Sequence, residues 1–246
     1  MKVSLLQSPH SRIWSRDRVP AIVQFCSLIL SGLAGWAGHW RVARSAKSLS
    51  KLLKEYQCVT RLCDWLVVFV ELSPSGMRRT MRTSPAFFTA IARILTTICL
   101  GLFLASEEVE LLASVGVVNK MLWPYASRLV PAFFFYYNFL KAITSAVLLQ
   151  AMHRISFEAT DTRSVSRKLQ YKEMLLSFLG GIGYMVYAMT LLPSNAPRLR
   201  EALHEDHYMY RIYSVLSSLC PQALQVRPAT QGFIGLLATV PFLFLS

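Results

Sequence analysis

The clearest pattern in the chain is a repeat of apolar residues at alternating intervals of three and four positions. An α-helix brings such positions onto one side, so the repeat predicts a single amphipathic helix from about Arg44 to Leu72. The apolar face of this helix consists of Leu49, Leu52, Tyr56, Val59, Cys63, Leu66 and Val70. Cations at the same spacing form another face, namely Arg44, Lys47, Lys51, Lys54 and Arg61. Such a helix is typical of segments that lie on a membrane with anionic head groups.

The segment just upstream predicts a second helix, from Arg16 to Trp40, with no charged residue between Val19 and Trp40. It is long enough to cross a bilayer, which takes about 20 apolar residues. A stripe of small residues on one side would also let another helix approach closely. An interfacial position is favoured, and a spanning one remains open. Arg16 and Arg18 join the cations expected at the membrane surface, so residues 1–76 form an interfacial, cytosolic amphipathic region.

Four apolar segments follow. Residues 84–106 predict a transmembrane helix, with three arginines before it and Glu107, Glu108 and Glu110 after it, which places its N-terminal side in the cytosol. Residues 107–227 form a helical, membrane-associated middle region in which 129–152 and 174–197 are possible further spans, and 229–246 predict a C-terminal anchor. Either two or four segments cross, and both counts leave the two termini in the cytosol. The predicted fold class is an all-α integral membrane protein, with amphipathic N-terminal helices followed by two to four transmembrane helices.

Composition supports this class. The 246 residues are 54% hydrophobic and 16% charged, with a formal net charge of +13. Soluble domains contain about one quarter charged residues. This low content of charged residues favours a membrane protein, with its basic loops beside anionic lipid, over a soluble nucleic-acid binder. We therefore predict no nucleic-acid partner.

The chain offers little sign of catalytic chemistry. Five scattered cysteines match neither a disulfide framework nor a zinc site. His204 and His207 lack the spacing of the metalloprotease motif, and we interpret them as part of a solvated polar turn. The sequence therefore predicts no enzyme, no cofactor and no metal site. Arg93, Arg128 and Lys141 lie in apolar segments and could line an anion path, which keeps a pore or carrier open as an alternative function.

The order of several short motifs resembles the peroxisomal biogenesis factor 11 family, which has glycosomal members. The motifs are Arg16-Asp17-Arg18 leading into a helix with Gln24, the pair Arg61-Leu62, the acidic element Glu107, Glu108 and Glu110 followed by Gly116, Trp123, and Gly232 and Gly235 near the end. The resemblance implies a protein of the peroxisomal or glycosomal membrane that elongates the organelle and promotes its division. It also implies self-association into a homo-oligomer and contact with the organelle fission machinery.

Overall fold

The computed structural model describes residues 9–84, 86–156, 164–192 and 221–243, and the elements in these ranges are helical. They are α1 (Pro9–Trp36), α2 (Trp40–Thr60), α3 (Asp64–Glu71), α4 (Pro74–Thr83), α5 (Phe87–Ser114), the 3-10 turn η2 (Lys120–Leu122), α6 (Trp123–Ser156), α7 (Ser164–Leu191) and α10 (Pro228–Leu243).

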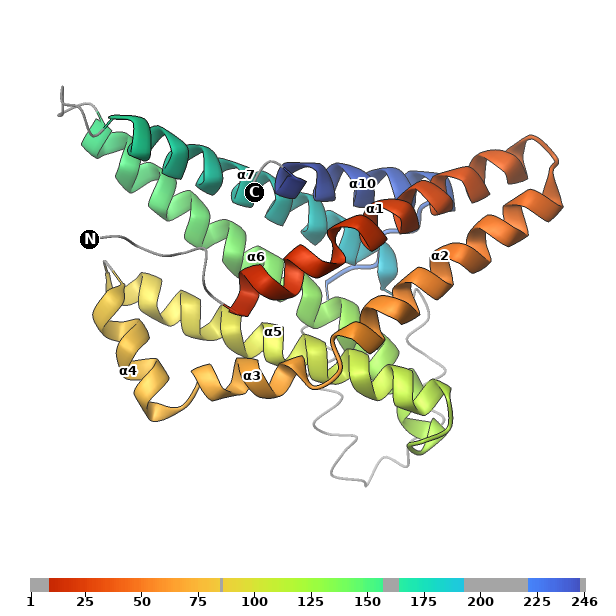
Figure 1. Cartoon of the computed structure of the whole chain (residues 1–246), viewed down its shortest axis with the longest axis horizontal. Coiled ribbons are helices and arrows are strands. Elements are labelled where there is room, and N and C mark those ends of the chain that lie inside the picture. The colour runs from red at the N-terminus through yellow and green to blue at the C-terminus, as the bar shows by residue number, and fades with distance from the viewer. Residues whose placement is uncertain (1–8, 85, 157–163, 193–220, 244–246) are drawn as a thin grey trace.

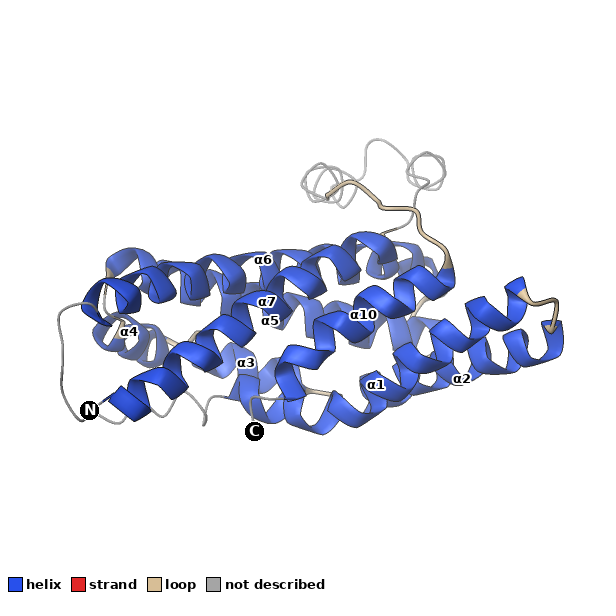
Figure 2. Cartoon of the chain, turned by 90° about the horizontal axis from the view of Figure 1, so that it is seen from above, coloured by secondary structure: helices blue, strands red, loops and turns tan. Residues whose placement is uncertain are grey.

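The long helices pack as neighbours in a layered bundle. Helix α6 lies between α5 and α7, and α10 lies between α7 and α1 (Figures 1 and 2). Helix α2 folds back along α1, and the tip of this α1–α2 hairpin projects from the bundle (Figure 1). Helices α3 and α4 pack along α5. Each short link thus joins helices that are adjacent in space.

Four helical segments are long and apolar enough to cross a membrane: Asp17–Trp36, Phe87–Ser114, Lys120–Met152 and Leu169–Leu191. The protein is therefore an all-α membrane protein, as the sequence predicted. The predicted C-terminal anchor corresponds to α10, whose 16 described residues span about 24 Å. That is less than the roughly 30 Å of a bilayer core, so this described part is short for a crossing by itself.

The single helix predicted from Arg44 to Leu72 is wrong, because α2 ends at Thr60 and α3 begins at Asp64. Cys63 between them has a φ of 64°, in the left-handed region. That conformation costs a non-glycine residue roughly 1–2 kcal/mol. The carboxylate of Glu108 on α5 offsets the cost, since it accepts hydrogen bonds from the Cys63 backbone N–H at 3.1 Å and from Trp65 Nε1 at 2.8 Å.

The apolar repeat survives this break for a geometric reason. Arg61 and Leu62 donate backbone hydrogen bonds to the carbonyls three residues earlier, at 3.2 Å each, so the chain keeps winding through the turn. Spacing alone therefore does not reveal the interruption. The contacts of Glu108, 45 residues away in sequence from Cys63, select the break.

Glycines bring α10 close to both of its neighbours. A Cβ added to Gly232 would lie 2.8 Å from the Phe25 carbonyl oxygen of α1. A Cβ added to Gly183 of α7 would lie 2.8 Å from the Ala238 Cα of α10. Small residues allow such close helix approach within membranes, where packing between helices replaces the hydrophobic effect as the main source of association.

Candidate functional site

The predicted apolar face is not covered by the helices that the structure describes. Its six large side chains have exposed fractions between 46% and 70%, and Cys63 is also exposed. We call these residues, Leu49, Leu52, Tyr56, Val59, Cys63, Leu66 and Val70, the apolar stripe. It continues from α2 across the turn onto α3.

Helix α2 contacts α1 through a different face. Small residues such as Ala43, Ala46 and Ser50 are buried there, and Ser31 on α1 donates a hydrogen bond to the Ala43 carbonyl at 2.8 Å. Since the small face satisfies the packing against α1, the apolar stripe is left pointing away from the hairpin. A contiguous exposed apolar surface of this kind marks contact with a membrane or another protein.

The predicted surface cations divide into distinct environments. Arg44, Lys47 and Lys51 are exposed on α2. Lys51 forms an ion pair with Glu55 one turn later at 3.5 Å, and both side chains remain largely in solvent. Lys54 forms an ion pair with Glu110 of α5, also at 3.5 Å. Arg18 is half-buried, and the side chain of Arg16 lies outside the described residues.

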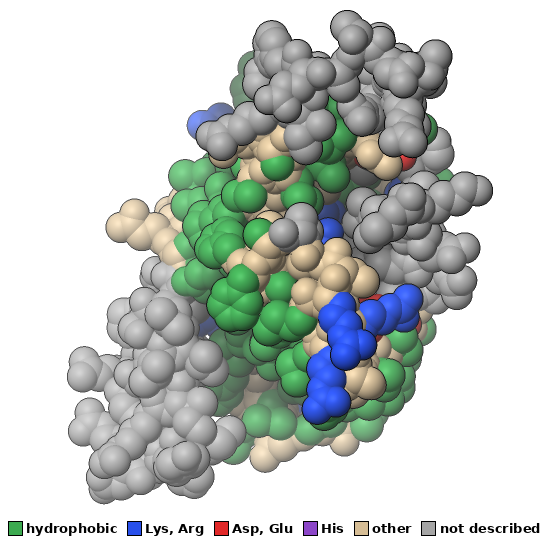
Figure 3. All heavy atoms as spheres, turned by 90° about the vertical axis from the view of Figure 1, so that its left-hand side faces the viewer, with side chains coloured by type: hydrophobic (Ala, Val, Ile, Leu, Met, Phe, Trp, Pro, Cys, Tyr) green, Lys and Arg blue, Asp and Glu red, His purple; other side chains and the backbone are tan. Residues whose placement is uncertain are grey.

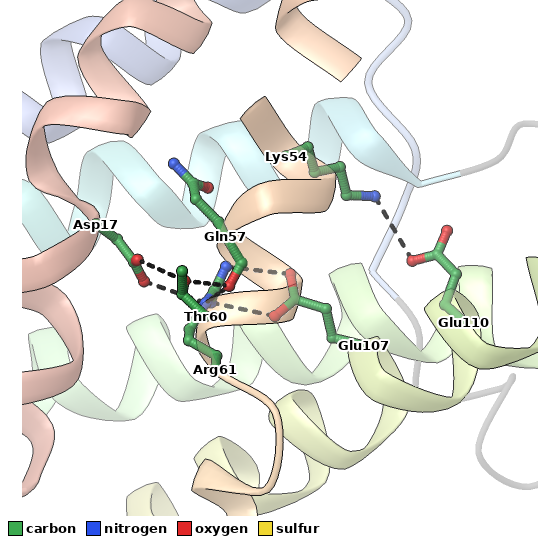
Figure 4. Close-up of polar contacts among 7 residues, drawn as sticks. All are labelled: Asp17, Lys54, Gln57, Thr60, Arg61, Glu107 and Glu110. Atoms are coloured by element: carbon green, nitrogen blue, oxygen red, sulfur yellow. Dashed lines mark hydrogen bonds and ion pairs between the residues drawn. The ribbon is translucent and has the colours of Figure 1, made fainter. Parts of the chain in front are cut away.

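Arg61 is buried, so the prediction that it belongs to the exposed cationic face is wrong. Its side chain is 8% exposed and forms ion pairs with Asp17 of α1 and Glu107 of α5, each at 3.1 Å (Figure 4). A second guanidinium nitrogen donates to the other Glu107 oxygen at 3.4 Å. The reason is the end of α2, which inserts between α1 and α5 and turns this residue inward. We call Asp17, Arg61 and Glu107, with the neighbouring Lys54–Glu110 pair, the charged junction.

Further hydrogen bonds hold the charged junction in place. Arg61 Nε donates to the Gln57 carbonyl at 3.1 Å, and the Thr60 hydroxyl donates to the same carbonyl at 2.9 Å. The Thr60 hydroxyl also lies 3.4 Å from an Asp17 oxygen (Figure 4). The guanidinium carbon lies 5.8 Å from the centre of the Phe103 ring, within cation–π range. The junction thus ties three helices together by both charge and geometry.

The environment of the junction shifts the pKa of two groups. Burial lowers the pKa of the Arg61 guanidinium, but the carboxylates of Glu107 and Asp17 raise it by more, so Arg61 stays charged. Burial, helped by the negative charge of Glu107, raises the pKa of the Cys58 thiol well above its usual range. Cys58 is consequently an inert, protonated thiol at neutral pH.

A cavity of about 340 Å³ opens beside the charged junction. Its polar lining residues include Asp17, Arg18, Gln57, Arg61 and Glu107. The others are mainly aromatic and aliphatic side chains, among them Phe25, Phe103, Phe134, Tyr187 and Leu191. Pockets for small molecules in proteins commonly combine an apolar lining with a few polar groups in this way.

Sequence reasoning missed this site. It assigned Glu107, Glu108 and Glu110 to the region after a transmembrane helix, whereas α5 continues through them to Ser114. A usable signal was present, because Glu107 follows the buried Leu100, Phe103 and Leu104 at helical spacing. That spacing places its carboxylate on the buried face, where it requires a partner.

The cavity brings together residues that are far apart in the sequence. Asp17 and Gln24 of α1, Arg61 at the end of α2, Glu107 of α5 and Trp123 of α6 all line it.

Other candidates lie elsewhere. Arg93, Arg128 and Lys141 do not line this cavity, and the Lys141 ammonium lies against the rings of Tyr137 and Phe242, at 5.8 and 4.7 Å from their centres. His204 and His207 fall outside the described residues. Among the residues that are described, no group of three or more metal-binding side chains comes together.

Comparisons with protein-family models, with curated proteins and with solved structures give no match to this chain. The described residues form two surfaces suited to binding, the apolar stripe with its cations and the cavity at the charged junction.

Proposed function

We propose that this protein shapes the membrane in which it is anchored, through the surface formed by the apolar stripe and the exposed cations of α2. The observation that carries the proposal is that this stripe stays uncovered while Arg44, Lys47 and Lys51 lie exposed on the same helix. Apolar side chains that enter one leaflet expand that leaflet and favour curvature. Each cation near anionic lipid adds about 1 kcal/mol of attraction, so these three supply about 3 kcal/mol.

The position of α2 beside α1 supports a location at the membrane surface. The two helices run antiparallel, since Asp17 pairs with Arg61 near one end and Ser31 contacts Ala43 toward the other. If α1 crossed the bilayer, the cations of α2 would lie at the same depth. Each would cost about 2.5–3.5 kcal/mol near the centre of the bilayer. An interfacial hairpin avoids this cost, while α5, α6, α7 and the C-terminal segment 229–246 provide the membrane anchor, an even number of crossings that keeps both termini on one side.

The organelle and the partners belong to the same proposal and rest on the family resemblance. The protein would reside in the peroxisomal or glycosomal membrane with both termini in the cytosol. There it would remodel and elongate the membrane, form homo-oligomers and promote division together with the fission machinery. Its lipid partner is an anionic membrane surface.

A pore or carrier for small metabolites is the second candidate. The observation that favours it is the same cationic face of α2, which would line an anion path if several copies enclosed it with their apolar stripes toward lipid. The two candidates differ in the depth of Lys47, which lies at the surface in the first and within the bilayer in the second.

The deciding experiment reconstitutes the full chain into liposomes with and without anionic lipid. Tubulation is recorded by electron microscopy and anion flux by dye release. The test variant replaces Arg44, Lys47 and Lys51 with Glu, and Lys54 is left intact because it pairs with Glu110. We expect wild-type tubulation that requires anionic lipid and is lost in this variant.

The matched control makes the same change of charge on α4. Arg78, Arg79 and Arg82 are exposed there, and Figure 3 shows a compact group of basic side chains at this end of the molecule. Replacing them with Glu is expected to preserve tubulation. Equal loss in both variants would show that net charge, and not α2, drives the effect. Anion flux without tubulation would contradict membrane shaping and favour the pore or carrier.

A further inference from the structure

The cavity beside the charged junction contains two hydrogen-bond donors that find no partner within the described parts of the chain. Gln57 is 7% exposed, and its side-chain nitrogen is buried without a hydrogen-bond partner. Its amide points away from the ion pairs of Arg61 (Figure 4). Arg18 Nε, which also lines the cavity, is likewise buried without a partner. Buried donors are nearly always paired in proteins, so these two indicate a site for an acceptor.

The charges around the cavity indicate the kind of acceptor. Arg61 is paired with Asp17 and Glu107, and Lys54 is paired with Glu110. Among the described residues, no carboxylate lies within ion-pair distance of Arg18. A guanidinium binds carboxylate and phosphate oxygens through charge-assisted hydrogen bonds, which are about twice as strong as neutral ones. Arg18 and Gln57 together therefore suit an anionic, oxygen-bearing head.

The rest of the cavity indicates what is attached to this head. Rings of Phe25, Phe103, Phe134 and Tyr187 line it, and Leu191 adds an aliphatic contact. The volume of about 340 Å³ is at the small end of the range for ligand pockets, which runs from roughly 300 to 1,000 Å³. This volume suits one short acyl chain.

We propose that the cavity binds a single-chain amphiphile with an anionic head. The head accepts hydrogen bonds from Gln57 and Arg18, and the chain packs among the aromatic rings. Free fatty acids and lysophospholipids share this chemistry, through a carboxylate in the first and a phosphate in the second. The site shares no residue with the apolar stripe, so binding to it and membrane shaping are tested by different variants.

The test measures equilibrium binding to the purified full-length protein in a neutral detergent. The probes are dodecanoate, 1-lauroyl lysophosphatidic acid, dodecanol and inorganic phosphate. We expect binding of one or both anionic amphiphiles, which identifies the head group. Dodecanol, which lacks the charge, and phosphate, which lacks the chain, are expected to bind at least tenfold more weakly.

Variants locate the binding. Gln57→Leu and Arg18→Met are each expected to lower the affinity at least tenfold, whereas Gln150→Leu, on an exposed part of α6, leaves it unchanged. Should Gln57→Leu fail to fold, Leu191→Trp tests the site without changing a polar group, because the larger side chain takes up space in the cavity. The proposal is overturned if the wild type binds no probe, if dodecanol or phosphate binds as tightly, or if the folded cavity variants retain full affinity.

Discussion

The middle of helix α2 and its C-terminal end carry cations in opposite environments. Lys51 has a side chain that is 78% exposed and pairs with Glu55 of its own helix. Arg61 is 8% exposed and pairs with carboxylates from two other helices. Both residues belong to one repeat in the sequence. The comparison shows that helical period places a cation on a face, and that the helices packed around that face decide whether it binds solvent, lipid or protein.

The energetic consequences differ in the same way. An exposed ion pair contributes little to the free energy of unfolding, because water and salt screen it and because two flexible side chains must be held in place. A buried pair is different, since removing one partner leaves an uncompensated charge inside the protein. The charged junction is therefore expected to be sensitive to substitution, and the exposed cations tolerant of it.

The largest effect is expected for Arg61→Met, which leaves Asp17 and Glu107 without their cation. We expect the free energy of unfolding to fall by about 3–5 kcal/mol, measured by denaturation of the full chain in detergent. Because the pKa of Arg61 is raised, its contribution is present at all pH values below its unfolded pKa and is lost only in strong alkali. Titration of Arg61 itself therefore does not change the loss between pH 6 and pH 9. A loss as small as that of an exposed lysine would contradict the burial of Arg61.

The next largest effect is expected at the glycines that bring α10 onto α1. Gly232→Ala forces a methyl group against the backbone of Phe25 and Ile29, and should cost about 1–3 kcal/mol. Gly35→Ala is the matched control on α1, since its nearest neighbours are side-chain atoms at 3.9 Å. Thermal unfolding of both variants measures the difference. Equal stability would show that the α1–α10 contact is looser than described.

A smaller effect is expected for Thr60→Val, which keeps the shape of the side chain and removes its hydroxyl. Loss of the hydrogen bonds to the Gln57 carbonyl and Asp17 should cost about 1 kcal/mol in unfolding experiments. Thr83→Val is the control, because that exposed hydroxyl bonds only to carbonyls of α4. If both variants lose the same amount, the Thr60 hydroxyl has no special role at the junction.

Lys51→Ala should have almost no effect on the fold. Its i,i+4 pair with Glu55 is exposed, and such pairs contribute about 0.3–0.5 kcal/mol. The expected change in unfolding free energy is within this range and should vanish at high salt. A loss above 1 kcal/mol would place this part of α2 in a buried environment.

The last prediction concerns the reactivity of two cysteines and involves no expected change in stability. In a variant that keeps only Cys58 and Cys63, a maleimide at pH 7.5 should react with the exposed Cys63 and spare Cys58. Burial and the raised pKa hold Cys58 as an unreactive thiol until the protein unfolds. Mass spectrometry of the labelled peptides distinguishes the two sites. Rapid labelling of Cys58 would show that the junction opens in solution.

Much of the fold could be predicted from local pattern. The apolar lengths of α5, α6 and α7 and the amphipathic repeat of α2 are visible in the sequence because each depends on neighbouring residues of one segment. The break at Cys63 could not be predicted, since it depends on Glu108 from another helix. The candidate cavity was missed for the same reason, as its lining residues come from six helices.

The sequence by itself determined that this is a helical membrane protein with an apolar and a cationic face on one helix. Those properties follow from the spacing and polarity of adjacent residues. Only the tertiary structure decided that Leu52 and Val59 remain uncovered while Arg61 is buried among carboxylates. The physical reason is that helical period fixes the direction of a side chain relative to its own helix, whereas burial and charge pairing depend on the helices that surround it.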